Sequence, residues 1–393
     1  MNLKRVAAAA LAATVVAIVA PAARAAEPYE INVILPLTGS TAFVGSTQQT
    51  AIKAVQDYVN KSGGIDGRPV SFVFADDQSD PKTSLQLAQG LIAKNVPVIL
   101  GPSSPQDCAA IQPLIEAKGP VFYCLANSGH PTTGGYEFLT LFPYEAQFAV
   151  TYRYFRQRGL KKIAYIVSTD GGGQEAEAAM LSQAALPENK DLVFVDKEHF
   201  APGDISVAAQ MARIKAANPD VVVYWATGAA AGTLFRSARD AGIDLPSVTS
   251  GGNMSANFFK QFGPLLPTNL YFAAVPYYAG DAVNAPATNS AIVTLTTSLA
   301  AVNAKPDMIQ ISAWDPAMVV VDALRKIGPN ATAAQLRTYM NGLRGWTGVN
   351  GSYDYKTNPQ RGVGENNVVM VRWDQQANKG IAVSKLGGAP IGK

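Results

Sequence analysis

The chain has 393 residues, of which 48% are hydrophobic, and it carries 32 Lys and Arg against 29 Asp and Glu. This length allows two domains with separate cores. So small a charge imbalance argues against binding to nucleic acid or to an anionic membrane surface.

The first 25 residues have the pattern of a secretory signal peptide. Lys4 and Arg5 precede an apolar run over residues 6–20, and Ala23-Arg24-Ala25 supplies the small residues that signal peptidase requires. A membrane anchor is the alternative, but the run is short for a bilayer and has no stop-transfer flank. We therefore expect cleavage after Ala25 and export to the periplasm. Cleavage would remove three of the 32 basic residues and none of the 29 acidic ones, so the mature chain would be neutral.

Segments typical of strands and helices alternate through the first third of the chain. Asp80 and Pro81 are a good N-cap and first helical residue, and Ser62-Gly63-Gly64 is a typical helix end. The predicted strands cover residues 30–37, 70–77, 96–101 and 120–124, and the predicted helices cover residues 48–60, 79–94 and 105–118.

The same alternation starts again after about residue 145. Strands are predicted at 161–168, 191–198, 219–225, 246–251, 269–278 and 366–374, and helices at 145–158, 174–185, 204–217, 230–241, 287–303, 311–327 and 332–343. Nearly continuous apolar strands separated by helices indicate parallel sheets buried on both faces. The expected fold class is α/β, with two doubly wound, Rossmann-like lobes and a central cleft.

The chain contains two cysteines, Cys108 and Cys124. They could form a disulfide or remain as two buried thiols. We favour the disulfide, because export would place them in an oxidising compartment.

Known catalytic motifs are missing from the sequence. It contains no GxSxG nucleophile elbow and no GxxxxGK[ST] phosphate loop, and the glycine run at residues 170–176 lacks the GxGxxG spacing. The only histidines, His130 and His199, have no neighbours at metal-ligand spacing. We therefore expect a binding protein without catalytic residues, metal or cofactor, whose ligand lies beyond the carboxyl ends of the strands.

Four stretches resemble the periplasmic solute-binding proteins of branched-chain amino acid ABC transporters, which have the type I fold. They are INVILPLTGSTAFVG, VNKSGGIDGRPVSFVFADDQSDP, VILGPSSPQDCAAIQPL and LANSGHPTTGGYEF. The resemblance implies two lobes joined by crossovers near residues 142–145, 274–276 and 362–365. The first lobe would comprise residues 26–144 and 277–365, and the second 145–276 and 366–393. It also implies hinged closure over a small ligand and delivery to an ABC permease in the inner membrane, and we expect a monomer.

The resemblance also assigns the carboxylate-binding part of the site. In the family, the loop that corresponds to residues 103–107 presents hydroxyl and N–H groups to a ligand carboxylate, which suits the start of a helix. An ordinary helix cap is the alternative role of this loop. A second loop of the family maps to residues 125–127. The ligand-binding residues predicted from these two loops are Ser103, Ser104, Pro105, Gln106, Leu125, Ala126 and Asn127.

The sequence departs from the family where the ligand's ammonium group would bind. Family members that bind amino acids place an acidic residue there, but this chain has Gly251, Gly252 and Asn253. Family tyrosines that crowd the ligand are also replaced, so we expect an enlarged and less polar site. Their positions match Val44, Gly173 and Thr227, with Phe43 beside the first; Trp225 and Trp314 could flank a ring.

A buried ammonium without a carboxylate would be unfavourable. The predicted ligand is therefore a small organic acid. The resemblance implies an aromatic acid similar to benzoate or cinnamate, since some family members with altered pockets bind such acids. A branched-chain or other aliphatic amino acid is the alternative within transport. A ligand-sensing receptor or regulator domain of the same fold is the alternative outside it.

The signal peptide gives the first testable expectation. Mass spectrometry of periplasmic material should find a mature N-terminus at or close to Ala26, because the small residues before it fit the peptidase. Recovery of the full-length chain from membranes alone would contradict this.

Overall fold

The computed structural model describes residues 27–126, 128–280 and 283–392. The predicted signal peptide and Asn127 lie outside these ranges. Within them, one sheet contains, in spatial order, β2 (Val70–Asp76), β1 (Tyr29–Leu35), β3 (Val98–Leu100), β4 (Val121–Cys124) and β5 (Glu137–Leu139). Its neighbouring strands are all parallel.

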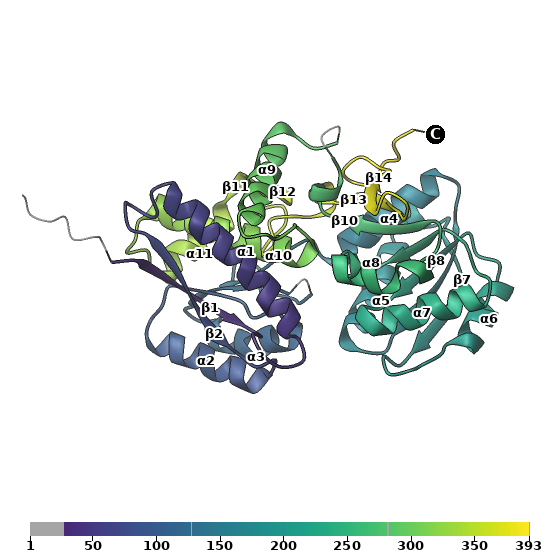
Figure 1. Ribbon diagram of the computed structural model, residues 1–393, viewed down its shortest axis with the longest axis horizontal. Coiled ribbons are helices and arrows are strands. Elements are labelled where there is room, and N and C mark those ends of the chain that lie inside the picture. The colour runs from purple at the N-terminus through teal and green to yellow at the C-terminus, as the bar shows by residue number, and fades with distance from the viewer. Residues whose placement is uncertain (1–26, 127, 281–282, 393) are drawn as a thin grey trace, which may run out of the picture.

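Helices cover both faces of this first sheet. Those on one side are α2 (Pro81–Ala93) and α3 (Pro105–Ile115); those on the other are α1 (Ala42–Lys61), α10 (Met308–Ile327) and α11 (Ala333–Gly342), with α9 (Pro286–Ala300) packed against α1 (Figure 1). As the sequence indicates, Pro81 opens α2 and the side chain of Asp80 accepts a hydrogen bond from the Lys82 N–H at 3.2 Å.

A second, larger sheet forms the other lobe. Its described strands are, in spatial order, β14 (Lys379–Ala382), β13 (Val369–Asp374), β10 (Leu270–Ala274), β9 (Ser247–Thr249), β8 (Val221–Trp225), β6 (Lys162–Ser168) and β7 (Val193–Phe200). Strand β13 runs antiparallel to β10 and β14, whereas the other pairs are parallel. The helices of this lobe are α4 (Tyr144–Gln157), α5 (Gly171–Ala184), α6 (Ala208–Ala216), α7 (Gly228–Asp240) and α8 (Ala256–Phe262).

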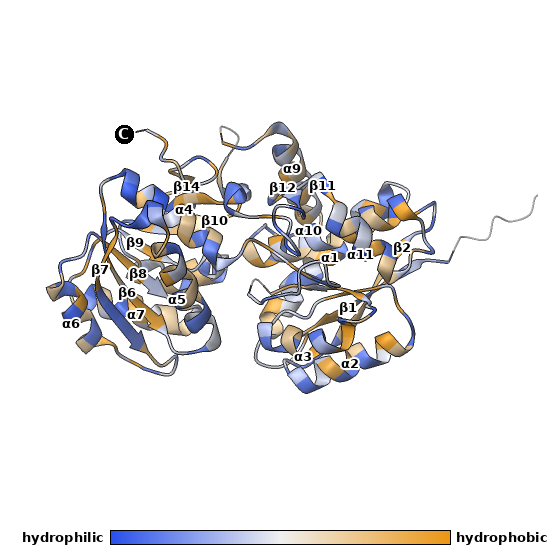
Figure 2. Cartoon of the chain, turned by 180° about the vertical axis from the view of Figure 1, so that it is seen from behind, coloured by the Kyte–Doolittle hydropathy of each residue, from blue (hydrophilic) through white to orange (hydrophobic). Residues whose placement is uncertain are grey.

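The predicted α/β class with two lobes is confirmed. The strands are largely hydrophobic while the outer surfaces of many helices are hydrophilic (Figure 2), and every residue of β8 is buried. Some short elements were not predicted: β5, β14, α8 and the hairpin of β11 (Arg344–Gly348) and β12 (Gly351–Asp354). Short 3-10 helices cover Pro187–Asn189, Gly251–Asn253, Gly263–Leu265, Pro276–Tyr278 and Glu365–Asn367.

A disulfide joins Cys108 to Cys124, with their Cα atoms 6.0 Å apart. Cys108 lies in the first turns of α3 and Cys124 is the last residue of β4. The bond therefore attaches the start of α3 to the end of β4.

The chain passes from the first sheet to the second after β5, returns after β10 and passes over again after β12. Arg361, which is only 7% exposed, lies at the last of these connections. Its guanidinium donates to the carbonyl oxygens of Thr140 and Leu141 at 3.4 Å, and so joins the last connection to the first. Burial lowers the pKa of Arg361 to about 10, so the group remains charged at neutral pH.

A buried carboxylate anchors the β11–β12 hairpin to α10. Asp315 accepts hydrogen bonds from the N–H groups of Val349 and Asn350 and from the Tyr353 hydroxyl, each at 2.9 Å. Burial raises the pKa of Asp315 to about 6, while these donors favour the ionised form.

We expect Asp315→Ala to lower the free energy of unfolding by about 3 kcal/mol or more, because each buried donor left unpaired costs about 1–3 kcal/mol. Urea unfolding followed by circular dichroism would measure the loss. Asp322→Ala is the matched control: this carboxylate, also on α10, is half-buried and accepts from Trp346 Nε1 at 2.8 Å. Equal losses in both variants would contradict the role given to Asp315.

Candidate ligand-binding site

A cavity of about 300 Å³ lies between the lobes, at the carboxyl ends of β3, β6, β8 and β9. This is the edge of a parallel sheet at which α/β proteins bind ligands. The first lobe contributes Pro105, Gln106 and Ser128; the other lining residues are Tyr144, Ser168, Asp170, Gly171, Gly172, Gly173, Trp225, Ala226, Thr227, Ser250 and Gly252.

Several helices begin at this cavity. Pro105 is the first residue of α3 and Gly171 the first residue of α5, while Thr227 directly precedes α7. The first N–H groups of a helix have no partner inside the helix, and its dipole is positive at this end. The cavity is therefore suited to an anionic group.

One lining residue, Asp170, is itself an anion. Its Oδ1 accepts hydrogen bonds from the Gly173 N–H at 2.8 Å and from the Ser168 hydroxyl at 2.9 Å, and it caps α5. The side chain is exposed at the cavity. Sequence reasoning missed this carboxylate, because the resemblance places the acidic residue near Gly251 rather than at the start of α5.

An aromatic wall closes one side of the cavity. Trp225, 3% exposed, packs edge to face against Tyr144 with ring centroids 5.4 Å apart. The ring of Phe148 lies 4.8 Å from the Trp225 ring on the α4 side. Trp225 is therefore held in place as a rigid apolar surface for a ligand.

The structure brings part of the predicted site together. The predicted residues that line the cavity are Pro105, Gln106, Gly173, Trp225 and Thr227. Asn127 lies outside the described residues, although Ser128 beside it lines the cavity.

The two serines of the first loop contact protein groups instead. The Ser103 hydroxyl donates to Gln48 Oε1, and Gln48 Nε2 donates to the Ser312 hydroxyl at 3.1 Å. Ser104 Oγ accepts from the Asp107 N–H at 3.2 Å, which is the ordinary helix cap considered above. These hydroxyls therefore position α3, and neither residue lines the cavity.

Asn253 also has a supporting position. Its Nδ2 donates to the Ala226 carbonyl at 2.9 Å and to the Thr249 hydroxyl at 3.0 Å, and its Oδ1 accepts from the Gly228 N–H at 3.3 Å. Because these bonds direct the buried amide toward the start of α7, it braces the loop after β8.

The remaining predicted residues are not among those that line the cavity. Leu125 and Ala126 are buried after β4. Phe43 is 47% exposed on α1, next to half-buried Val44. Trp314 is buried on α10, with its ring 6.5 Å from that of Tyr58.

Gly173 has a different role from the one expected. The sequence suggests that this glycine enlarges the site, but a Cβ at residue 173 would lie 1.8 Å from the Ser168 carbonyl oxygen. A side chain there would collide with the end of β6. Glycine is therefore required because α5 begins so close to the strand.

A hydrogen bond crosses between the lobes beside the cavity. The Gly129 N–H donates to Glu175 Oε1 of α5 at 3.2 Å. The carbonyl of the same residue accepts from Arg361 at 3.1 Å. Gly129 thus links the cavity wall of the second lobe to the connections between the lobes.

The sequence matches a known protein family. A family model described as "Periplasmic binding protein" matches residues 28–380. The chain belongs to this family. This confirms the family expected from the sequence, a solute-binding family that includes the binding proteins of branched-chain amino acid transporters.

Named relatives and solved structures agree with this membership. Leu/Ile/Val-binding protein homolog 3 of Brucella melitensis is 26% identical over 341 residues, covering 85% of this chain and 88% of the relative. The branched-chain amino acid transporter substrate binding protein of Streptococcus pneumoniae, solved with isoleucine, has a TM-score of 0.73 at 18% identity, covering 91% of this chain and 100% of that one. A solute binding protein of an ABC transporter from Rhodopseudomonas palustris, solved with benzoate, has a TM-score of 0.72 at 18% identity, covering 93% and 98%.

The described ranges of this periplasmic binding protein contain no helix long and apolar enough to cross a membrane. In the same ranges, no three His, Cys, Asp or Glu side chains are grouped so that they could hold a metal ion.

The glycines at the start of α5 provide a matched test. We expect Gly173→Ala to lower the free energy of unfolding by about 1–3 kcal/mol, because the added methyl group overpacks the turn after β6. Gly172→Ala should leave stability unchanged or slightly raised, since the nearest atom to its Cβ is Asp170 Oδ1 at 3.7 Å. Thermal unfolding of both variants would measure the difference. Equal stability of the two would contradict the close approach at Gly173.

Proposed function

We propose that this protein is the extracytoplasmic solute-binding component of an ABC importer and that its ligand is a small aromatic carboxylate similar to benzoate or cinnamate. The ligand binds between the two lobes, which close over it, and the protein delivers it to a permease in the inner membrane. Membership of the periplasmic binding protein family supports the transport role.

The observation that carries the ligand class is the meeting of helix starts at one cavity. The first turns of α3 and α5 and Thr227, the residue before α7, line the same 300 Å³ space. Hydrogen bonds from N–H groups to a carboxylate are charge-assisted and stronger than neutral ones. The backbone therefore supplies the charge recognition that a carboxylate needs.

The size and walls of the cavity support an aromatic body. A volume of about 300 Å³ is at the lower end for small-molecule sites, which suits a single ring with a short chain. Trp225 and Tyr144, whose rings meet edge to face, provide an aromatic wall for that ring. The Rhodopseudomonas palustris protein solved with benzoate gives an example of this fold with such a ligand.

Asp170 favours a second candidate, an aliphatic amino acid. Its carboxylate lies at the cavity and could accept the ligand's ammonium group. The Brucella melitensis relative is named a Leu/Ile/Val-binding protein, and the Streptococcus pneumoniae structure contains isoleucine. Against this, Asp170 Oδ1 already caps α5 and binds Ser168, so the start of the helix offsets much of its charge.

A thermal-shift assay with benzoate, cinnamate, leucine and isoleucine separates the two candidates. We expect an aromatic acid at about 100 times its dissociation constant to stabilise the fold by roughly 2.7 kcal/mol. Leucine and isoleucine should give no shift, because their ammonium group would lose its hydration without a fully available carboxylate.

Asp170→Asn sharpens the test, because Asn caps helices as well as Asp and the start of α5 should survive. The variant should keep or strengthen the affinity for the aromatic acid, since it removes a negative charge from the cavity. If leucine stabilises the native protein, aromatic acids do not, and Asp170→Asn abolishes the leucine shift, the amino acid is the ligand and our proposal fails.

A further inference from the structure

A second cavity, of about 730 Å³, shares no lining residue with the candidate ligand-binding site. It lies beside the connection that leaves β10. One wall comes from α8, β13 and β14 of the second lobe. The other comes from Tyr277 and Tyr278 after β10 and from residues 305–307 before α10.

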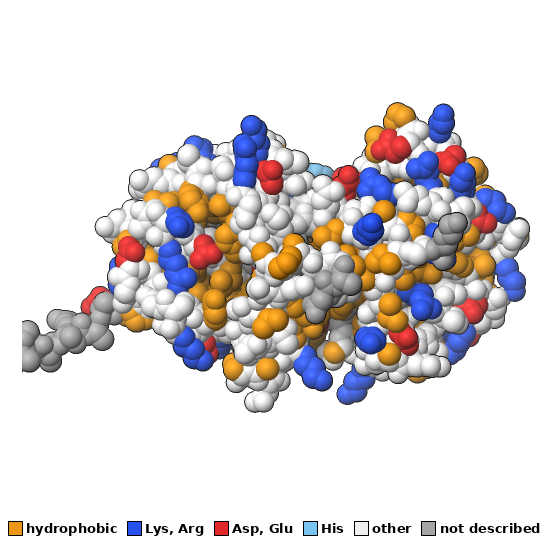
Figure 3. All heavy atoms as spheres, turned by 90° about the horizontal axis from the view of Figure 1, so that it is seen from above, with side chains coloured by type: hydrophobic (Ala, Val, Ile, Leu, Met, Phe, Trp, Pro, Cys, Tyr) orange, Lys and Arg blue, Asp and Glu red, His pale blue; other side chains and the backbone are white. Residues whose placement is uncertain are grey.

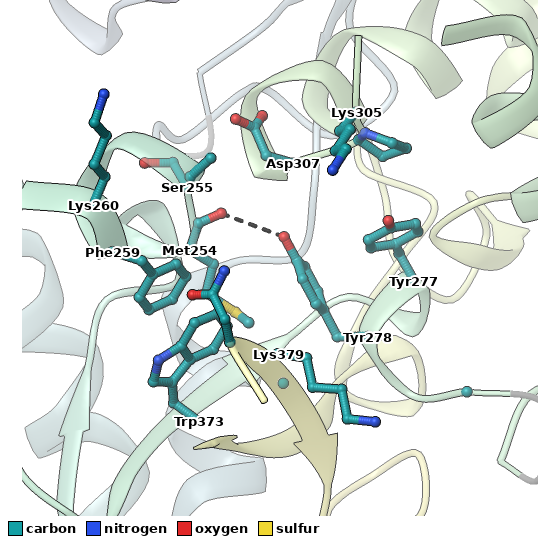
Figure 4. A pocket seen from close by; sticks show the side chains of 15 residues that line it. Met254, Ser255, Phe259, Lys260, Tyr277, Tyr278, Lys305, Asp307, Trp373 and Lys379 are labelled. Carbon is teal, nitrogen blue, oxygen red and sulfur yellow. Dashed lines mark hydrogen bonds between the residues drawn. The ribbon is translucent and has the colours of Figure 1, made fainter. Parts of the chain in front are cut away.

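Two pairs of aromatic rings make up much of this cavity. Phe259 and Trp373 stack in parallel, with ring centroids 3.4 Å apart. Tyr277 and Tyr278 meet edge to face at 4.9 Å, and the Tyr278 hydroxyl donates to the Met254 carbonyl at 3.3 Å. The two pairs lie on different sides of the cavity (Figure 4). A flat apolar group placed between them would contact rings on both sides.

The charged residues of the cavity are mostly positive. Among its described lining residues, Lys260, Lys305 and Lys379 are cationic and Asp307 is anionic. Asp307 Oδ1 accepts from the Ile309 and Gln310 N–H groups at 2.9 and 3.2 Å, so the start of α10 offsets its charge.

The lysines differ in position. Lys305 lies beside Asp307, while the amino groups of Lys260 and Lys379 extend outward at the rim (Figure 4). Seen from above, hydrophobic side chains are exposed along the boundary between the lobes, with Lys and Arg side chains nearby (Figure 3). Long lysine stems can cover apolar surface while the amino group stays in water. The cavity therefore combines an aromatic interior with a cationic edge.

We propose that this cavity is a second binding site, separate from the cleft, for a small organic anion with an aromatic body. The aromatic body lies between the Phe259–Trp373 pair and the tyrosines, and the anionic group faces Lys305. The volume is within the range of small-molecule sites. The site stands independently of the ligand proposed for the cleft.

The aromatic sulfonate 8-anilinonaphthalene-1-sulfonate is a suitable probe, because it has the required charge and rings and its fluorescence rises in an apolar site. We expect saturable binding at one site per chain in a fluorescence titration of the mature protein. Ala256, an exposed lining residue in the first turn of α8, can be changed without removing a core side chain. Ala256→Trp should place an indole inside the cavity and weaken probe binding at least about tenfold, since the indole occupies space that the rings of the probe need.

Asn257→Trp is the matched control, because Asn257 is the exposed neighbour of Ala256 on the same helix and does not line the cavity. It should leave probe affinity within about twofold of the native value, as surface changes usually do. Lys305→Gln should weaken the probe several-fold, with a smaller difference at high salt because salt screens the charge. Thermal unfolding of each variant verifies that it is folded.

The proposal is overturned if the native protein shows no saturable probe binding, or if Ala256→Trp and Asn257→Trp have the same effect. It is also overturned if Thr227→Trp, which fills the cleft, removes probe binding while Ala256→Trp does not. Benzoate thermal shifts measured on Ala256→Trp and Thr227→Trp assign the benzoate site to the second cavity or to the cleft, so failure of one site is distinguishable from failure of the other.

Discussion

The buried guanidinium of Arg361 joins two of the connections between the lobes. It donates to the carbonyl groups of Thr140, Leu141 and Gly129, which belong to the first connection and to the loop after β4. A buried cation is tolerated only where opposite charges and hydrogen bonds compensate it. Among the nearby carboxylates, that of Glu175 on α5 contributes most to this compensation. The N–H group of Gly129 donates to that same Glu175. One charged group therefore connects the segments between the lobes with a helix that forms the cavity.

Each helix start at the cavity is fixed by its own polar contacts. Ser104 caps α3 while the disulfide attaches that helix to β4. Asp170 caps α5, and Asn253 binds the N–H of Gly228 at the start of α7. The side chains thus position the loops at the cavity. The N–H groups of Asp107, Gly173 and Gly228 are paired with these caps, so the remaining N–H groups of the first turns are the ones left for an anion. This explains how a cavity with few charged side chains can suit an anion.

The sequence predicts the elements whose patterns are local. The apolar run of β8 and the Asp80–Pro81 start of α2 indicate their structures directly, and the family resemblance gave the correct two-lobe fold. Strand β5 and the β11–β12 hairpin are too short for a periodic pattern to appear. The roles of Ser103 and Asn253 depend on partners 55 and 27 positions away, Gln48 and Ala226, which no local pattern reveals.

Asp170 and Gly173 show why ligand selectivity is harder to predict than the fold. Replacement of a family tyrosine by glycine suggests added space, yet the backbone of β6 leaves no room for a side chain at residue 173. Asp170 resembles the acid of an amino acid site, yet one of its oxygens is already bound to the start of α5. Selectivity then depends on a balance of charges. In our proposal, Asp170 would stabilise a ligand ammonium group only weakly, because the start of α5 offsets the charge of its carboxylate. A ligand carboxylate would accept hydrogen bonds at the starts of α3 and α7 without competing for Asp170 Oδ1. On this balance of charges we propose a ligand with one negative group and an uncharged, flat body beside Trp225, which lines the cavity.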